Sequence, residues 1–300
     1  SAASDVYKRQ VMISMMLLQL ARGKACAERV VEVLDTEIDI VNPENAFVPT
    51  EPKGEVEFKN VNFKYDPESH GDNILENISF KAKPGQIVGI VGGTGCGKSS
   101  LVNLIPRLYD ATQGEVLVDG VNVKKYDLKA LREMIGVVLQ KNVLFSGTIE
   151  ENIRWGKKDA THEEIVAACK AAQADSFINE QPDGYNTYLA QGGLNLSGGQ
   201  KQRLCIARAM IKKPKILILD DSTSAVDTAT EAKIRESFYS DLKDTTVFII
   251  AQRISSVKDA DEILVVDDGK IKGVGNHDEL IKTNEIYQEI YNTQQKGVLE

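Results

Sequence analysis

The residues whose types and spacing could do chemistry are most concentrated in one glycine-rich stretch. It consists of Gly92, Gly93, Thr94, Gly95, Cys96, Gly97, Lys98, Ser99 and Ser100. From Gly92 to Ser99 it fits the pattern G-x-x-x-x-G-K-[ST], the phosphate-binding loop or P-loop. Glycines let the backbone curl so that successive N–H groups point inward, and a following helix N-terminus adds partial positive charge. Lys98 would reach the β- and γ-phosphates of a nucleoside triphosphate, and the Ser99 hydroxyl would bind Mg²⁺.

The segments on either side of this stretch favour the phosphate-binding interpretation. Residues 86–91 form a short apolar run that predicts a buried strand, and residues 101–105 have the apolar spacing of a helix. The motif requires this strand–loop–helix context. The alternative is a glycine-rich turn with no ligand. The matched context makes a nucleoside triphosphate the expected ligand, and Cys96 is expected to line its site.

A second group with chemical potential follows an uninterrupted apolar run at residues 216–219. The run ends in two acids, Asp220 and Asp221. A buried strand would deliver Asp220 to the carboxyl edge of a sheet, beside the phosphates, where it could hold Mg²⁺. The alternative is a core strand whose trailing acids face solvent. The P-loop upstream favours the Mg²⁺ interpretation.

Composition narrows the range of partners. The chain has 300 residues, a net charge of −8 and a hydrophobic content of 42%. Nucleic-acid partners are not expected, because phosphate backbones are bound by basic patches. The cysteines Cys26, Cys96, Cys169 and Cys205 are scattered, without a C-x-x-C pair. This spacing indicates neither a zinc site nor a disulfide framework, and it favours a reducing environment.

The elements needed to position these groups alternate along the chain. Expected strands lie at residues 55–61, 77–82, 86–91, 115–118, 136–140, 216–220, 246–250 and 262–266. A mainly helical region is expected from Thr148 to about Asn179, with a capping box of Thr161 and Glu164. A turn at residues 267–269 and a short final helix end the chain. This order predicts an α/β fold whose sheet is mostly parallel, with an antiparallel β layer on the N-terminal side.

The N-terminal segment is expected to be separate from the rest. Residues 5–10 resemble the translated end of a sequencing adapter, so residues 1–10 are expected to be non-native. Residues 11–20 are strongly apolar but too short to span a bilayer, so they predict either a packed helix or the last turns of a membrane helix that begins upstream. Residues 22–34 predict an amphipathic helix. The prolines and polar residues of 41–54 predict a linker, with a domain boundary near residue 50.

One further motif makes the chain resemble a known family. The run Leu196-Ser197-Gly198-Gly199-Gln200 lies between the P-loop and the acidic strand. It matches the signature of ATP-binding cassette (ABC) proteins in sequence and in order. The resemblance covers roughly residue 54 to the C-terminus. It implies a P-loop nucleoside triphosphatase core, with an inserted helical subdomain at about residues 148–213, and the cofactors ATP and Mg²⁺.

The resemblance also implies roles for single residues. Tyr65 looks like the aromatic that stacks on adenine, although it could be an ordinary tyrosine at a strand end. Gln140 looks like the glutamine that senses Mg²⁺ and the attacking water. Residues 224–227, which end in Asp227, resemble a loop that crosses a dimer interface. In such a dimer, ATP on one cassette's P-loop meets the partner's signature, here Ser197, Gly198, Gly199 and Gln200.

Other features resemble the exporter branch of the family. These are the apolar N-terminal segment, Asn195 before the signature, and residues 145–149 after Gln140. The expected partners are a second ABC cassette and a transmembrane domain upstream in the same chain. The expected location is the cell membrane, with this domain on the cytoplasmic face. The alternatives are a separate importer ATPase and a soluble regulatory, mechanical or nucleic-acid-directed ABC ATPase.

Three positions depart from the family pattern. Asp221 stands where a glutamate usually polarises the water, Gln252 where a histidine is expected, and Gln191 where a glutamate precedes the signature. The candidate catalytic residues are Asp221, Gln252 and Gln140, and the departures at Asp221 and Gln252 predict slow hydrolysis at this chain's own P-loop. A heterodimer with a non-identical half-transporter would then supply one fully active site.

Overall fold

The computed structural model describes residues 2–67, 71–221 and 226–296. It divides into two compact units, residues 1–41 and residues 42–300. Each unit is described by itself.

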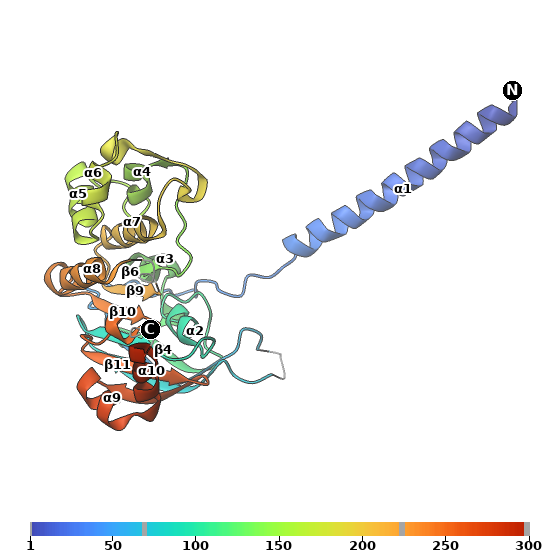
Figure 1. Ribbon diagram of the computed structural model, residues 1–300. Coiled ribbons are helices and arrows are strands. Elements are labelled where there is room, and N and C mark those ends of the chain that lie inside the picture. The colour runs from blue at the N-terminus through green and yellow to red at the C-terminus, as the bar shows by residue number, and fades with distance from the viewer. Residues whose placement is uncertain (1, 68–70, 222–225, 297–300) are drawn as a thin grey trace. The chain divides into compact units, whose positions relative to one another are not determined.

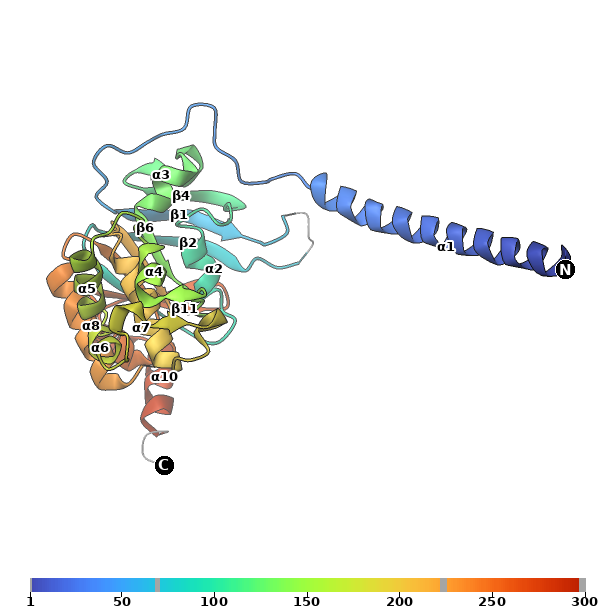
Figure 2. The same ribbon diagram turned by 90° about the horizontal axis from the view of Figure 1, so that it is seen from above.

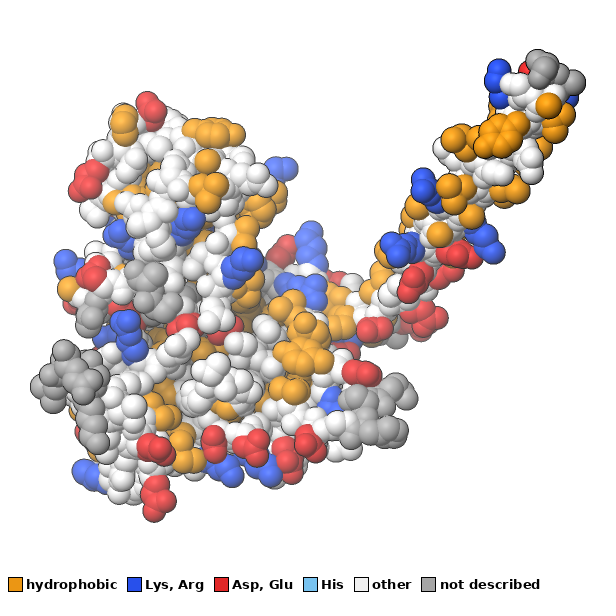
Figure 3. All heavy atoms as spheres, turned by 45° about the vertical axis from the view of Figure 1, so that its right-hand side comes forward, with side chains coloured by type: hydrophobic (Ala, Val, Ile, Leu, Met, Phe, Trp, Pro, Cys, Tyr) orange, Lys and Arg blue, Asp and Glu red, His pale blue; other side chains and the backbone are white. Residues whose placement is uncertain are grey.

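The first unit is essentially one helix, α1 (Ala2–Leu34). It joins the apolar segment at 11–20 and the helix expected from residue 22 into a continuous element. Figure 3 shows hydrophobic side chains along much of its length, interrupted by charged ones. Among the described residues, no helix combines the length and the apolar character needed to cross a membrane.

The second unit contains an antiparallel sheet close to its start. Its strands are β1 (Val56–Phe63), β2 (Leu75–Ala82), β4 (Gln113–Val118) and β5 (Val121–Asn122), in the order β2-β1-β4-β5. All pairings within this sheet are antiparallel. The antiparallel layer predicted on the N-terminal side is therefore confirmed.

The main sheet is mostly parallel, as predicted. It contains β3 (Ile87–Val91), β6 (Ile135–Val138), β9 (Ile216–Asp220), β10 (Thr246–Ile250), β11 (Glu262–Asp267) and β12 (Lys270–Gly275). Their order is β12-β11-β3-β10-β9-β6. Only the pairing of β11 with β12 is antiparallel. The strands β3, β10, β9 and β6 therefore all end at the same edge.

Helices gather in a region between β6 and β9 in the chain. They are α4 (Ile149–Arg154), α5 (His162–Ala171), α6 (Asp175–Asn179) and α7 (Gly198–Met210), grouped at the top of Figure 1. A two-stranded sheet of β7 (Gly147–Thr148) and β8 (Tyr188–Leu189) accompanies them. The predicted capping box of Thr161 and Glu164 starts α5. The mainly helical character predicted here is confirmed.

The remaining helices are α2 (Lys98–Asn103), α3 (Leu128–Glu133), α8 (Thr228–Asp241), α9 (His277–Thr283) and α10 (Glu285–Lys296). Of these, α2 packs between the two sheets, and Figure 2 shows α2, α3, α8 and α10 from above. Short 3₁₀ turns lie at residues 123–125, 184–186, 191–193 and 254–256.

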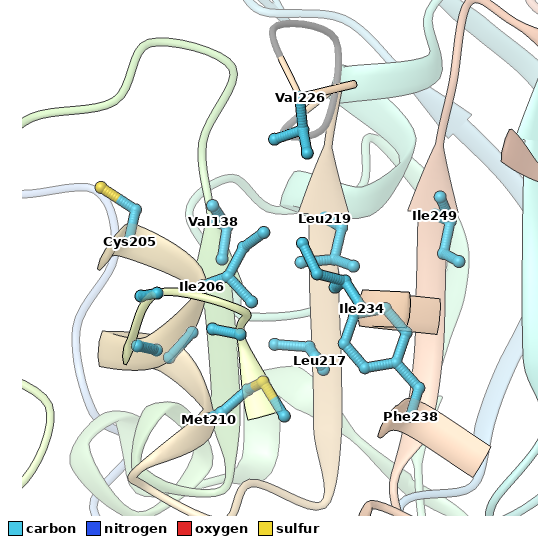
Figure 4. Packing of buried hydrophobic residues seen from close by; sticks show 14 of the residues in the cluster. Val138, Cys205, Ile206, Met210, Leu217, Leu219, Val226, Ile234, Phe238 and Ile249 are labelled. Atoms are coloured by element: carbon cyan, nitrogen blue, oxygen red, sulfur yellow. The ribbon is translucent and has the colours of Figure 1, made fainter. Parts of the chain in front are cut away.

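Strand β9 separates two hydrophobic clusters, because its side chains alternate between the faces of the sheet. Leu217 and Leu219 face helices α7 and α8, where they meet side chains such as Ile206 and Phe238 (Figure 4). Ile216 and Ile218 join the cluster on the opposite face, which includes residues of α2 and of the antiparallel sheet. This alternation decides which way the acid at the end of β9 points.

Two segments differ from the sequence-based expectation. The chain ends in a β11–β12 hairpin and two helices, whereas the sequence predicted one strand, a turn and one helix. Strand β12 is rich in Lys and Gly and only partly buried, so its pattern was weak. The predicted linker at 41–54 also belongs largely to the second unit, which begins at Asn42. Phe47 pairs with Tyr126, their ring centroids 5.1 Å apart, and Asn42 donates to Asp127.

Candidate functional site

The candidate site lies at the carboxyl edge of the main sheet. The P-loop follows β3, and Asp220 ends β9 with Asp221 directly after it. Gln252 comes two residues after β10, and Gln140 comes two residues after β6. Because these strands are parallel neighbours, their following residues meet at one edge. The order of strands thus assembles residues that are far apart in the sequence.

Two glycines of the P-loop combine a positive φ with a close neighbouring group. Gly92 has φ +154° and Gly97 has φ +96°. A Cβ at Gly92 would lie 2.0 Å from the carbonyl oxygen of Val266 in β11, and one at Gly97 would lie 2.8 Å from Leu75. The glycines therefore let the loop curl tightly against the sheet, which leaves its interior lined by backbone.

The Lys98 side chain lies within this curl. Its Nζ donates to the carbonyl oxygens of Gly92 at 2.9 Å and Gly93 at 2.6 Å, and it lies 3.7 Å from the Sγ of Cys96. The first turn of α2 begins at Lys98 itself. Positive charge is thus concentrated where a phosphate could replace the loop carbonyls as the partner of the ammonium group.

Asp220 meets the P-loop helix directly. The Ser99 hydroxyl donates to Asp220 Oδ1 at 3.1 Å. Asp220 reaches it because, two residues after Ile218, it points to the face of the sheet that α2 covers. Burial raises the pKa of Asp220, and the hydrogen bond from Ser99 opposes that rise. A hydroxyl and a carboxylate are oxygen ligands that suit Mg²⁺, which commonly completes its shell with water and phosphate oxygens.

Asp221 directly follows Asp220, and its carboxylate accepts hydrogen bonds from two side-chain amides. Its Oδ2 accepts from Gln252 Nε2 at 2.7 Å and from Gln140 Nε2 at 3.4 Å. Its backbone has φ +45°, and its N–H donates to Ile250 at 3.0 Å. Burial raises the pKa of Asp221, and the bond from Gln140 opposes this most strongly. The structure therefore brings together the predicted residues Asp221, Gln140 and Gln252.

Tyr65 lies at another side of the P-loop helix. Its hydroxyl is 2.8 Å from the Ser100 Oγ, and the residue remains 53% exposed. The rings of Phe63 and Tyr109 pack against it edge-on, with centroids 4.9 and 5.0 Å away. This packing holds an accessible aromatic ring next to the loop. Tyr109 was not predicted from the sequence, where its only signal is an aromatic residue soon after the P-loop helix.

The signature residues do not share this edge. Ser197 caps α7 and forms a capping box with Gln200, while Ser197 and Gly198 are exposed. Helix α7 packs on one face of the main sheet, through Leu204 and Ile206, whereas α2 lies on the other face. Among the contacts of the described residues, none joins the signature to the P-loop. The two predicted ATP-contacting groups are therefore separate within one chain.

Of three other predicted positions, Gln191 and Asn195 precede the signature in the chain, and Asp227 lies at the start of another helix. Asp227 caps α8, its Oδ1 accepting from the N–H of Thr230 at 3.0 Å, and this backbone bond lowers its pKa. Asn195 donates to the carbonyl of Tyr188 and so braces the segment before the signature. Gln191 is exposed in a 3₁₀ turn. Residues 224 and 225, also predicted to reach a dimer interface, lie outside the described residues.

A parallel sheet with a P-loop between β3 and α2 and acids at the end of a nearby strand defines the P-loop nucleoside triphosphatase fold. The sequence profile of the family described as ABC transporter matches residues 75–224. The chain therefore belongs to the ABC transporter family. The P-loop core predicted from the sequence is thereby confirmed.

Individual relatives carry exporter names. The putative multidrug export ATP-binding/permease protein YgaD of Bacillus subtilis (strain 168) is 44% identical over 92% of this chain and 47% of its own length. The ATP-dependent lipid A-core flippase of Haemophilus influenzae (strain 86-028NP) is 44% identical over 93% and 47%. A solved bacterial Atm1-family ABC exporter with ATP bound gives a TM-score of 0.86 and 36% identity, over 94% of this chain and 49% of that one. The chain thus spans about half the length of these relatives.

Proposed function

We propose that this chain is the ATP-binding and ATP-hydrolysing domain of an ABC exporter. The observation that carries the proposal is the contact of Ser99 with Asp220 beside Lys98 in the curl of the loop. The ammonium group binds the β- and γ-phosphates, and Ser99, Asp220 and Gln140 hold Mg²⁺. Tyr65 offers its exposed ring to adenine, and the backbone of residues 92–100 surrounds the phosphates.

Hydrolysis at this P-loop is slow in our proposal, because the residues that would orient water depart from the family pattern. Asp221 is one methylene shorter than glutamate, and its Oδ2 is already engaged by Gln252 and Gln140. A displacement of about 1 Å can lower a rate on the order of a hundredfold. Gln252 supplies hydrogen bonds but lacks the titratable ring of histidine.

The signature is exposed and lies apart from this chain's own P-loop, so it is free to contact ATP bound to a second cassette. Its serine, its glycine N–H groups and the N-terminus of α7 are suited to a γ-phosphate bound elsewhere. We therefore propose a dimer in which this signature completes a partner's ATP site, and that the partner is a non-identical half-transporter with glutamate and histidine at the two altered positions. ATP binding would favour the closed dimer, and hydrolysis would release it.

We also propose that this domain lies at the cytoplasmic face of the cell membrane. The relatives' names and the half-length match support a transmembrane domain elsewhere in the assembly. The residues that would select the transported substrate belong to that transmembrane part.

A complementation experiment tests the composite site. One variant carries Lys98→Ala, which removes its own phosphate contact but keeps its signature. The other carries Asp221→Glu and Gln252→His with Ser197→Arg, which blocks its signature. Each variant alone should turn over ATP slowly. The mixture should be faster, because one site of the mixed dimer would combine the restored P-loop site of the second variant with the unaltered signature of the first. A mixture no faster than the sum of its parts contradicts the composite site. Brisk ATPase of the unchanged chain alone contradicts the asymmetry.

A further inference from the structure

The C-terminal helix reaches the segment that carries Gln252 through one side chain. Gln294, near the end of α10, donates from Nε2 to the carbonyl oxygen of Gln252 at 2.7 Å. Its Oε1 accepts from the N–H of Ile254 at 2.9 Å. A single side chain therefore binds the backbone on both sides of Arg253.

The Gln294 amide provides the hydrogen bonds that a neighbouring strand would provide within a sheet. Strand β10 ends at Ile250, and Ala251 still donates to the carbonyl of Ile90 in β3 at 3.2 Å. Just beyond, the sheet no longer supplies partners to the Gln252 carbonyl and the Ile254 N–H. A primary amide has both a donor and an acceptor, so Gln294 satisfies both groups at once. A carboxylate in its place could satisfy only the N–H.

Helix α10 is anchored at its other end. Tyr287 is fully buried, with its hydroxyl 2.8 Å from Nδ1 of His277 in α9. Asn284 donates to the carbonyl of Lys272 in β12, and Ile286 and Ile290 pack on the hydrophobic core. The last turn instead borders a cavity of about 740 Å³ that is lined in part by Gln294. The position of this turn against the loop thus depends strongly on the Gln294 amide.

We propose that Gln294 is a positioning residue for Gln252. By fixing the backbone on either side of Arg253, it holds the Gln252 side chain where its amide reaches Asp221 Oδ2 at 2.7 Å. The proposal rests on the proposed function, in which Asp221 and Gln252 orient the water that attacks the γ-phosphate. Among its described contacts, Gln294 itself touches neither the Asp220 nor the Asp221 carboxylate.

Helix α8 secures the following part of the same loop. Arg235 donates to the carbonyl of Ser255 at 3.1 Å, and Tyr239 donates to that of Asp259. Loss of the Gln294 contact should therefore shift the backbone near Gln252 without unfolding the loop. The expected change is local, and the global stability should be nearly that of the parent.

The first test reads the position of Gln252 directly in the 300-residue chain. Gln294→Glu keeps the shape of the side chain and its acceptor, but it removes the donor and sets a carboxylate against the Gln252 carbonyl. Gln295→Glu makes the same charge change at the next, exposed position and is the matched control. The side-chain amide resonance of Gln252, identified by its loss in Gln252→Ala, should shift in Gln294→Glu and not in Gln295→Glu. An unmoved resonance in Gln294→Glu overturns the proposal.

The second test uses steady-state ATPase rates. Gln294→Glu should lower kcat about tenfold with KM for ATP unchanged, and Gln295→Glu should match the parent. In a Gln252→Ala background, Gln294→Glu should have no further effect, because it acts through Gln252. A full tenfold effect in that background overturns the positioning role. If Gln252→Ala leaves kcat unchanged, the proposed role of Gln252 in hydrolysis is wrong, while the resonance test still decides whether Gln294 positions it.

Discussion

The two sides of the site are held in different ways. One side is the P-loop with Asp220, here called the phosphate side. There, Lys98 is bound by backbone carbonyls and Ser99 by the buried acid at the end of β9. The other side consists of Asp221, Gln140 and Gln252, here called the water side because these residues are proposed to orient the attacking water. There, Asp221 is held by the two side-chain amides of Gln140 and Gln252. In the function proposed above, phosphate binding would therefore depend on backbone shape, whereas the positioning of the attacking water would depend on the lengths and types of side chains. A sequence can therefore keep the first while it changes the second.

The backbone of the phosphate side gives the largest expected effect. Gly92→Ala should lower the free energy of unfolding by more than about 2 kcal/mol, because a Cβ there would lie 2.0 Å from the Val266 carbonyl. Gly93→Ala is the matched control, since nothing lies within 4 Å of its added Cβ. Denaturant unfolding of both variants measures the difference. Equal stabilities would show that the loop does not pack on β11 as described.

The charge inside the loop should have the next largest effect. Lys98→Ala should weaken MgATP binding by about a hundredfold in calorimetry, because it removes a charge-assisted contact to the phosphates. Lys129→Ala, on the exposed surface of α3, is the control. Undiminished MgATP binding by Lys98→Ala would remove the basis for the phosphate side altogether.

Restoring the family pattern on the water side sharpens the comparison. Asp221→Glu combined with Gln252→His should raise the turnover of the isolated chain by about tenfold, with KM for ATP nearly unchanged. The longer carboxylate would bring the water closer, and the imidazole would add a titratable group. Adding Lys98→Ala to the same variant should abolish the gain. If the double substitution raises nothing, the two departures are not what limits hydrolysis.

Much of this site could be predicted because its residues follow the ends of buried strands. An apolar run that ends in Asp220 fixes both the strand and the direction of the acid, and the P-loop pattern fixes the turn before α2. Once the strands are parallel, the edge where these groups meet follows from geometry. The signature helix was predictable for a similar reason, since Ser197 and Gln200 form a local capping box.

The rest depended on contacts between distant residues that no local pattern shows. Gln294 binds backbone groups 40 and 42 residues away in the sequence. Phe47 lies among prolines, yet its ring meets Tyr126 and draws the predicted linker onto the cassette. Strand β12 has too few large apolar residues for its alternation to be visible, and it forms because β11 offers an edge.

The smallest predicted effect concerns Cys96, which tests whether bound nucleotide fills the curl of the loop. Its Sγ lies 3.7 Å from Lys98 Nζ, and the residue is only 9% exposed, so alkylation should be slow. MgATP should slow it a further few-fold, on the order of 3 to 10, because the phosphates would cover the loop. Cys26, exposed on α1, is the internal control and should react at the same rate with or without nucleotide. Mass spectrometry of the two modified peptides gives both rates in one sample. A Cys96 rate that MgATP leaves unchanged would mean that the nucleotide binds without covering this thiol, and the P-loop would then bind phosphate in a geometry other than the one its backbone indicates.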